Sequence, residues 1–122
     1  MKPLVTSVSE VEAMVIGAAE GTSMQVLIPA TAAQNFIMRR IVIKAGGSMP
    51  NHTNSVEHEQ YVLSGSAEVG IGDQVHHLKQ NDVLLIPPGV PHWYRASAEE
   101  DYVFICLIPN KEDIITLIDT VE

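Results

Sequence analysis

The sequence predicts an all-β fold that occupies residues 1–122 as a single domain. The length of 122 residues is enough to bury one hydrophobic core and too short for two. From Met24 onward, short runs of Val, Ile, Leu, Tyr and Phe alternate with Gly, Pro, Asn and Asp. That punctuation is typical of strands and turns, and many short strands at close spacing indicate a β-sandwich or a β-barrel.

The predicted strands follow one another from residue 24 to residue 108. They cover residues 24–28, 35–43, 59–63, 67–70, 74–78, 82–86, 93–95 and 102–108. Turns are predicted at residues 45–47, 64–65, 71–73 and 80–82. Each of these turns contains Gly or Asn, the residues that most readily adopt a positive φ.

The two terminal segments carry different patterns. In residues 9–19, Ser9 is a candidate helix N-cap with Glu12 three residues later, but the apolar run that follows also suits an early strand, so both readings stay open. In residues 111–121, apolar side chains recur near a period of 3.6 residues. That period predicts one or two final helical turns packed on the barrel.

Composition and charge disfavour several kinds of partner. Acidic residues outnumber basic residues by 15 to 7, and the formal net charge of -8 repels nucleic acid and anionic lipid. No apolar run approaches the roughly 20 residues that cross a bilayer, and Met1 is not followed by the apolar core of a signal peptide. We therefore expect a cytoplasmic protein with neither nucleic-acid nor membrane partners. The single cysteine, Cys106, agrees with a reducing compartment.

Three histidines mark the candidate site. His52 and Asn54 lie two residues apart and so project from one face of a strand, while His58 begins the next strand and His92 follows the stiff segment 87–91. Neutral imidazoles that converge from separate strands suit a divalent transition metal such as Mn, Fe, Co, Ni, Cu or Zn, with positions left for water or substrate. The sequence predicts one such ion, with His52, His58 and His92 as ligands and Asn54 as a fourth candidate.

The spacing of these residues resembles the two signatures of the cupin family, G-x5-H-x-H-x3-4-E-x6-G and G-x5-P-x-G-x2-H-x3-N. The first signature matches residues 46–65 through Gly46, His52, Asn54, His58 and Gly65. The second matches residues 81–96 through Asn81, Pro87, Gly89, His92 and Ala96. With its flanking strands, the resemblance covers most of the chain. It implies a double-stranded β-helix, or jelly roll, of the RmlC-like cupin 2 type, with short helical or irregular terminal segments.

Three positions depart from these signatures. Asn54 stands where the family usually has its second histidine, His58 stands where it usually has glutamate, and Asn81 replaces a turn glycine. Asn tolerates that turn because it visits the left-handed region comparatively well. With His58, the first motif resembles small manganese-binding cupins that use four histidines, of which this chain keeps three. A metal without a carboxylate ligand keeps its full charge, so we expect a strong Lewis acid and a reduced affinity for the ion.

Polar side chains facing the lumen are the predicted catalytic residues. Gln60 shares the strand parity of His58, and Tyr94 shares that of His92, so both are expected to point inward with a polar tip on an apolar wall. The resemblance places Arg39 as a candidate to close the pocket. Tyr94, Gln60 and Arg39 are therefore the candidates to orient or activate a ligand.

Other inward-facing side chains are predicted to line the pocket. They are Met38, Met49, Val62, Phe104 and Cys106. The resemblance to four-histidine cupins implies that Phe104 and Cys106 lie beside the metal, with Met49 and one of residues 38–39 closing the pocket. Ordinary core packing explains Phe104, Met38 and Met49 equally well. For Cys106, a buried inert thiol is the simpler interpretation, because no base adjacent in sequence lowers its pKa.

Strand alternation also predicts residues that face away from the lumen. His76 and His77 are consecutive, so they cannot both enter it, and we expect them at the surface or at a sheet edge. Glu57 and Glu59 face away from the metal, where either can brace an imidazole. Trp93 points outward.

The resemblance implies a homodimer. Cupins commonly form one by exchange of an N-terminal strand, and the apolar residues 26–28 suit that role. The outward-facing Trp93 suits a subunit interface as well.

Fold alone does not fix function, and three functions stay open. The first is a metal-dependent dioxygenase acting on a small organic molecule, since three-histidine iron cupins cleave small thiols and β-diketones. The second is a metal-dependent isomerase or lyase of a sugar or sugar acid, as in small cupins of pectin breakdown. The third is a non-catalytic binding module for a small ligand. The sequence identifies neither the substrate nor the metal.

Overall fold

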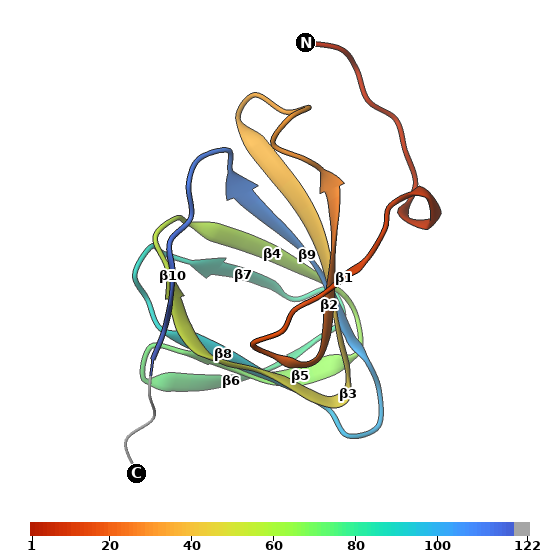
Figure 1. Cartoon of the computed structure of the whole chain (residues 1–122). Helices are drawn as coiled ribbons and strands as arrows, with labels where there is room; N and C mark the ends of the chain where they lie inside the picture. The colour runs from red at the N-terminus through yellow and green to blue at the C-terminus, as the bar shows by residue number, and fades with distance from the viewer. Residues whose placement is uncertain (119–122) are drawn as a thin grey trace.

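The computed structural model describes residues 1–118 and confirms an all-β fold (Figure 1). The strands are β1 (Met14–Val15), β2 (Glu20–Ile28), β3 (Phe36–Asn54), β4 (His58–Ser64), β5 (Ser66–Ile71), β6 (Gln74–Lys79), β7 (Val83–Ile86), β8 (His92–Ala96), β9 (Tyr102–Pro109) and β10 (Ile115–Leu117). A single 3-10 turn, η1 (Val8–Glu10), precedes them. Each strand predicted from the sequence lies within or overlaps one of these elements.

The strands form one antiparallel sheet that folds over on itself. Its main path runs β6-β5-β8-β3-β9-β4-β7, while β2 and β10 also pair with β3, and β1 pairs with β2. The first part of β3 pairs with β2 and β9, and its last part pairs with β8 and β10. In Figure 1, β4, β7 and β9 therefore lie on one side of the barrel, and β5, β6 and β8 lie on the other.

The predicted turn at residues 45–47 is a bend inside β3 and does not separate two strands. Gly46 has a φ of 75°, and a Cβ atom on Gly47 would lie 2.6 Å from the carbonyl oxygen of Glu20. These two glycines let one continuous strand pass from one half of the sheet to the other. The prediction was wrong because a glycine pair in a strand also marks a bend or a close backbone approach.

Strand alternation aims the residues of both motifs into the barrel, as predicted. In β4, His58, Gln60 and Val62 are buried while the residues between them are exposed. In β8, His92 and Tyr94 are buried in the same way. Burying a side chain such as Val62 stabilises the fold by about 1.5–3 kcal/mol, so the apolar members of each strand hold the polar members in place.

The N-terminal segment forms an early strand after one 3-10 turn. Met14 in β1 lies opposite Met24 in β2, so of the two structures left open for residues 9–19 the strand is the one that forms. Asn81 adopts a φ of 75°, in agreement with the turn predicted there. Among residues 1–118, no helix is long and apolar enough to cross a membrane.

The C-terminal segment is a strand, and the helical prediction for residues 111–121 is wrong over the described part, residues 111–118. β10 runs antiparallel to the end of β3, with Ile115 opposite Asn54 and Leu117 opposite His52. The same apolar residues also alternate with a period of two through Ile115 and Leu117, and the last residues of β3 offer them a backbone ladder. The remainder of the predicted range lies outside the described residues. The tail thus lies along the first motif.

Candidate functional site

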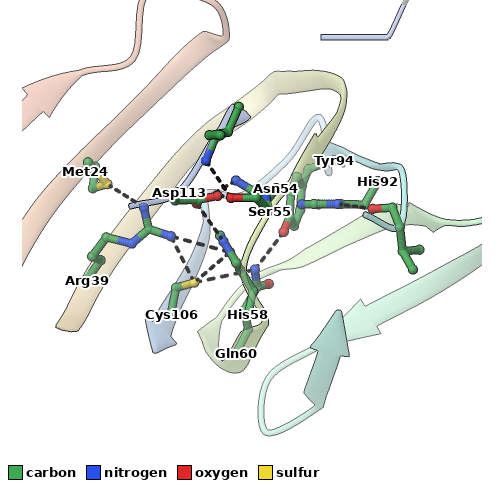
Figure 2. A network of polar contacts seen from close by, with 12 residues as sticks. Met24, Arg39, Asn54, Ser55, His58, Gln60, His92, Tyr94, Cys106 and Asp113 are labelled. Atoms are coloured by element: carbon green, nitrogen blue, oxygen red, sulfur yellow. Dashed lines mark hydrogen bonds and ion pairs between the residues drawn. The ribbon is translucent and has the colours of Figure 1, made fainter. Parts of the chain in front are cut away.

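A cavity of about 210 Å³ opens inside the barrel, and the motif residues lie at its wall. Its lining is mainly apolar. The lining residues are Ile16, Ala18, Ala19, Met24, Arg39, Ile41, Met49, Pro50, His52, Asn54, His58, Gln60, His92, Tyr94, Phe104, Ile115 and Leu117. The predicted ligands and the predicted catalytic residues therefore share one cavity, and Figure 2 shows the polar network that joins several of them. The volume lies below the roughly 300–1,000 Å³ of drug-sized sites, so the cavity suits a small ligand.

His52 and His92 lie next to each other on the paired strands β3 and β8. Their ring centroids are 4.2 Å apart. His52 donates a hydrogen bond from Nδ1 to the carbonyl oxygen of Pro50 at 2.8 Å, and His92 donates from Nδ1 to that of Val90 at 3.0 Å. A carbonyl oxygen only accepts, so each neutral ring carries its proton on Nδ1 and keeps a lone pair on Nε2. This is the tautomer that a metal-binding histidine needs.

His58, at the start of β4, is held differently. Its ring centroid is 6.2 Å from that of His92. Its Nε2 lies 3.2 Å from Oδ2 of Asp113, while its Nδ1 lies 3.5 Å from Nη2 of Arg39 and 3.4 Å from Sγ of Cys106. Since the carboxylate accepts and the guanidinium donates, neutral His58 carries its proton on Nε2 in this arrangement.

Burial keeps two of the histidines neutral at pH 7. It lowers the pKa of His58 to about 4, helped by the charge of Arg39 and opposed by the contact with Asp113. It also lowers the pKa of His92 to about 4, opposed by the hydrogen bond to Val90. The close pair of His58 and Asp113 is therefore a hydrogen bond from a neutral ring to a carboxylate. Neutral imidazole is also the form that binds a metal.

Asp113 is the site residue that sequence reasoning missed. The side chain is 12% exposed, and its Oδ2 accepts a hydrogen bond from Nδ2 of Asn54 at 2.9 Å as well as the one from His58. Its Oδ1 accepts from the backbone N–H of Ser55 at 3.0 Å. Asp113 lies outside both signatures, in a tail predicted to be helical, so no signal in the sequence placed it at the site.

Asn54 has one buried atom without a hydrogen-bond partner. Its amide nitrogen faces the carboxylate of Asp113, which fixes the orientation of the amide because a carboxylate only accepts. The amide oxygen, Oδ1, is buried and accepts no hydrogen bond from residues 1–118. Leaving a buried acceptor unpaired costs about 1–3 kcal/mol, so this oxygen is suited to a ligand or an ion.

The structure tests the predicted metal site by donor type. Three neutral imidazoles and an unpartnered amide oxygen at one cavity fit a divalent transition metal. Within residues 1–118, however, no three His, Cys, Asp or Glu side chains are grouped closely enough to form a metal cage as they stand. His52 and His92 are adjacent, whereas Nε2 of His58 faces Asp113. The identity and presence of the ion stay predictions.

Arg39 places a positive charge in the cavity wall without a carboxylate partner among the described residues. Its Nη1 lies 3.6 Å from Sδ of Met24, and its Nη2 lies 3.3 Å from Sγ of Cys106 and 3.5 Å from Nδ1 of His58. Its Nε is buried and has no hydrogen-bond partner within residues 1–118. The ion pairs formed within residues 1–118 do not include it. Sulfur atoms are weak acceptors, so much of the hydrogen-bonding capacity of this guanidinium is unused. The arrangement suits an anionic ligand.

Gln60 and Tyr94 form a buried polar pair beside the histidines. Nε2 of Gln60 donates to the hydroxyl of Tyr94 at 2.7 Å, and Oε1 of Gln60 is buried with no hydrogen-bond partner among the residues that the structure describes. The ring of Tyr94 stacks on Phe104 at 5.4 Å and meets His92 edge-on at 5.8 Å. Burial raises the pKa of Tyr94, so it stays a phenol with its own proton to donate. Both residues line the cavity, as predicted.

The structure brings two of the five residues predicted to line the pocket to this cavity. Met49 and Phe104 line the cavity. Met38 does not, because it has the opposite parity to Arg39 on β3. Val62 and Cys106 are fully buried but lie in the core outside the cavity lining. The sulfur of Cys106 contacts the guanidinium of Arg39. Burial raises the pKa of the Cys106 thiol, which agrees with an unreactive cysteine.

The outward-facing residues lie where alternation predicts. His76 and His77 are exposed on β6, which is an edge strand. Glu57 and Glu59 are exposed as well. Trp93 covers Gly70 on the outer face and leaves no room there for a Cβ atom. These residues take no part in the cavity.

The sequence profile of the Cupin domain family matches residues 39–108, more than half of the chain. The chain belongs to the cupin family. The matched segment includes Arg39 and every predicted metal ligand, but it ends before Asp113.

Relatives of this cupin have several activities. An acireductone dioxygenase from Citrobacter koseri is 29% identical over 65 residues, which cover 50% of this chain and 36% of the dioxygenase. The xanthan biosynthesis protein XanB from Xanthomonas campestris pv. campestris is 43% identical over 61 residues, which cover 48% of this chain and 13% of XanB. The polyketide cyclase RemF from Streptomyces resistomycificus superposes with a TM-score of 0.87 and 24% identity, covering 100% of this chain and 88% of RemF. Together these similarities establish the fold and leave the activity open.

Proposed function

We propose that this cupin is a metal-dependent enzyme of the dioxygenase type that acts on a small organic anion in the barrel lumen. The observation that carries the proposal is Arg39, a guanidinium in the cavity wall without a carboxylate partner among residues 1–118. Arg39 is half-buried, and a charge that is partly removed from water is stabilised by an anionic partner, so the site favours a ligand that brings a negative charge. Carboxylates and enolates of β-dicarbonyl compounds meet that requirement.

His52, His58 and His92, together with the oxygen of Asn54, are the residues that would hold the metal. A bound divalent ion would supply Lewis-acid chemistry and, for a redox-active metal, oxygen activation. Arg39 pairs with the anionic group of the ligand, and Gln60 and Tyr94 orient its polar atoms. The apolar remainder of the lining excludes water from the bound ligand.

The partial similarity to acireductone dioxygenase supports the oxygen-using alternative, although it covers 36% of that protein. The apolar lining disfavours a sugar, whose hydroxyl groups need many hydrogen-bond partners. A sugar-acid isomerase or lyase, in line with the similarity to a xanthan biosynthesis protein, and a non-catalytic binding module are therefore the competing outcomes of the test.

The test is oxygen consumption by protein loaded anaerobically with ferrous iron. The substrate panel contains small thiols, β-diketones and hydroxy-enones, with sugar acids followed in parallel by proton-exchange NMR. We expect oxygen uptake with an enolisable anion and its loss in Arg39→Met. Exchange on a sugar acid without oxygen uptake would assign the protein to the isomerases, and binding without any turnover would make it a binding module.

We also propose that the protein forms a homodimer in the cytoplasm. Residues 26–28 pair with β3 of their own chain in the structure, while the outer face of β4 and β7 exposes apolar side chains. On that face Val83 is 70% exposed and Leu85 is 58% exposed. A self-complementary two-fold contact would cover both. Light scattering tests it: Val83→Glu is expected to give a monomer, and a monomeric parent protein would contradict it.

A further inference from the structure

We infer that Asp113, delivered by the C-terminal segment, is a carboxylate ligand of the metal in this cavity. The inference rests on the proposed metal site and adds to it a residue that neither signature contains. It replaces the expectation of a metal without a carboxylate by a site of three histidines and one aspartate. The ion it fits is a divalent transition metal such as Mn²⁺, Fe²⁺ or Zn²⁺.

The position of the carboxylate is the first argument. Oδ2 of Asp113 lies 3.2 Å from Nε2 of His58, the nitrogen that points away from Arg39 and Cys106. The same oxygen lies 2.9 Å from the amide nitrogen of Asn54. Asp113 is not itself part of the cavity lining, but its carboxylate lies beside two lining residues, His58 and Asn54, that are candidate ligands (Figure 2).

The charge of the carboxylate is the second argument. Asp113 is 12% exposed, and within residues 1–118 its carboxylate accepts hydrogen bonds from the ring of His58, the amide of Asn54 and the backbone N–H of Ser55 but forms no ion pair with a Lys or Arg side chain. A largely buried carboxylate that has no Lys or Arg partner is incompletely compensated. The buried amide oxygen of Asn54 has no hydrogen-bond partner in the described part of the chain, and it offers a second lone pair to a cation at the same place. A divalent ion satisfies both.

Hydrogen bonds hold the tail that carries Asp113 against residues 51–55 of the first motif. The backbone N–H of Ile114 donates to Oγ of Ser55 at 2.7 Å, and β10 continues the contact by pairing with residues 52–54. Ile118 donates to the carbonyl oxygen of Asn51 at 3.0 Å. Ile115 and Leu117 also line the cavity. The carboxylate is thus placed by a ladder of backbone contacts, which is the preorganisation that a ligand needs.

The experiment measures metal affinity, which does not depend on knowing the substrate. The full-length protein is stripped with a chelator, and the dissociation constants of Mn²⁺ and Zn²⁺ are measured by chelator competition for the parent protein, Asp113→Asn and Glu112→Gln. Asp113→Asn keeps the size and an accepting oxygen, while Glu112→Gln removes an exposed neighbouring carboxylate as a matched control. We expect at least about tenfold weaker binding in Asp113→Asn and no change in Glu112→Gln.

A second measurement separates ligation from a structural role of the tail. The visible spectrum of the Co²⁺-loaded protein and the electron paramagnetic resonance of the Mn²⁺-loaded protein both report the ligand set. Both are expected to change in Asp113→Asn, whereas hydrogen exchange of β10 is not. Binding within twofold of the parent, with unchanged spectra, would overturn the role of Asp113 and leave the metal site standing. Failure of the parent protein to bind either metal would overturn the site and this inference together.

Discussion

The two sides of the cavity hold their histidines in different ways. His52 and His92 are fixed by hydrogen bonds to the carbonyl groups of Pro50 and Val90, each two residues earlier in the chain. His58 is fixed by side chains that arrive from distant segments, namely Arg39 on β3, Cys106 on β9 and the tail aspartate. One side is built by local sequence, and the other is built by the topology.

This difference teaches what each side can do. His52 and His92 present their Nε2 atoms to the cavity independently of distant side chains, because hydrogen bonds to nearby backbone carbonyl groups orient their rings. The His58 side can change its ligand-facing nitrogen with the groups around it, since its neighbours donate and accept through side chains. We therefore expect a metal ion to bind first to His52 and His92 and then to recruit His58.

The largest expected effect is the loss of stability on acidification, and it tests whether both sides bury neutral rings. Because the pKa values of His58 and His92 are about 4 in the folded protein and about 6.5 when unfolded, the unfolded state binds more protons below pH 6.5. The free energy of unfolding should be flat above pH 6.5, fall between pH 6.5 and 4, and lose this dependence below pH 4. The slope has a ceiling of about 1.4 kcal/mol per pH unit for each histidine.

Urea unfolding of the metal-free protein at a series of pH values measures this slope. His58→Gln and His92→Gln are each expected to reduce it by up to half, and the exposed His76→Gln serves as the control. A slope between pH 6.5 and 5 that is undiminished in both buried variants would show that neither ring carries it.

The next effect compares ligands across the two sides. His92→Ala and His58→Ala are each expected to abolish metal binding, a loss of more than about a hundredfold, because each removes an imidazole donor. Asn54→Ala should weaken binding by only about tenfold, since an amide oxygen is a weaker donor. Elemental analysis of protein purified without added metal checks all three. Equal losses of metal binding in Asn54→Ala and His58→Ala would show that Asn54 contributes as much to binding as a histidine ligand.

The sequence predicted the residues on the strands of both motifs well and the contribution of the tail poorly. Spacing and strand alternation were sufficient for His52, His58, His92, Gln60 and Tyr94, because a strand fixes which residues share a face. Asp113 was missed, since its contact with His58 spans 55 residues and depends on where the tail docks. The tail was misjudged because a short apolar run fits periods of 3.6 and of two alike. The bend in β3 was misjudged for a comparable reason: two glycines mark both a turn and a bend.

A smaller effect concerns the unpaired charge on the His58 side. Arg39→Met removes a cation that has no carboxylate partner within residues 1–118 and keeps an unbranched apolar stem, so the metal-free protein is expected to gain about 1 kcal/mol of stability. Affinity for small organic anions should fall by more than about tenfold. Urea unfolding and calorimetric titration with a carboxylate panel measure the two effects.

Arg40→Met is the matched control for that change. Arg40 is the next residue on β3, faces the other side and donates to Oε1 of Gln25 at 3.0 Å. Its replacement is expected to lower stability slightly and to leave anion binding unchanged. If both variants lose anion binding equally, the net charge of the barrel, and not the placement of Arg39, would be responsible.

The smallest effect separates the two sides most cleanly, because it loosens one without touching the other. Ser55→Ala removes the hydroxyl that accepts from the backbone N–H of Ile114 and should weaken docking of the tail by about 1 kcal/mol. Hydrogen exchange is expected to speed up in β10, and the NMR signals of His58 are expected to shift. The signals of His52 and His92 should stay in place, because their Nδ1 atoms bond to their own backbone segments. Ser66→Ala, which removes an exposed contact with Glu100 far from the tail, is the control. Equal shifts of all three histidines in Ser55→Ala would mean that the tail orders the whole site, and the distinction between a local and a topological side would fail.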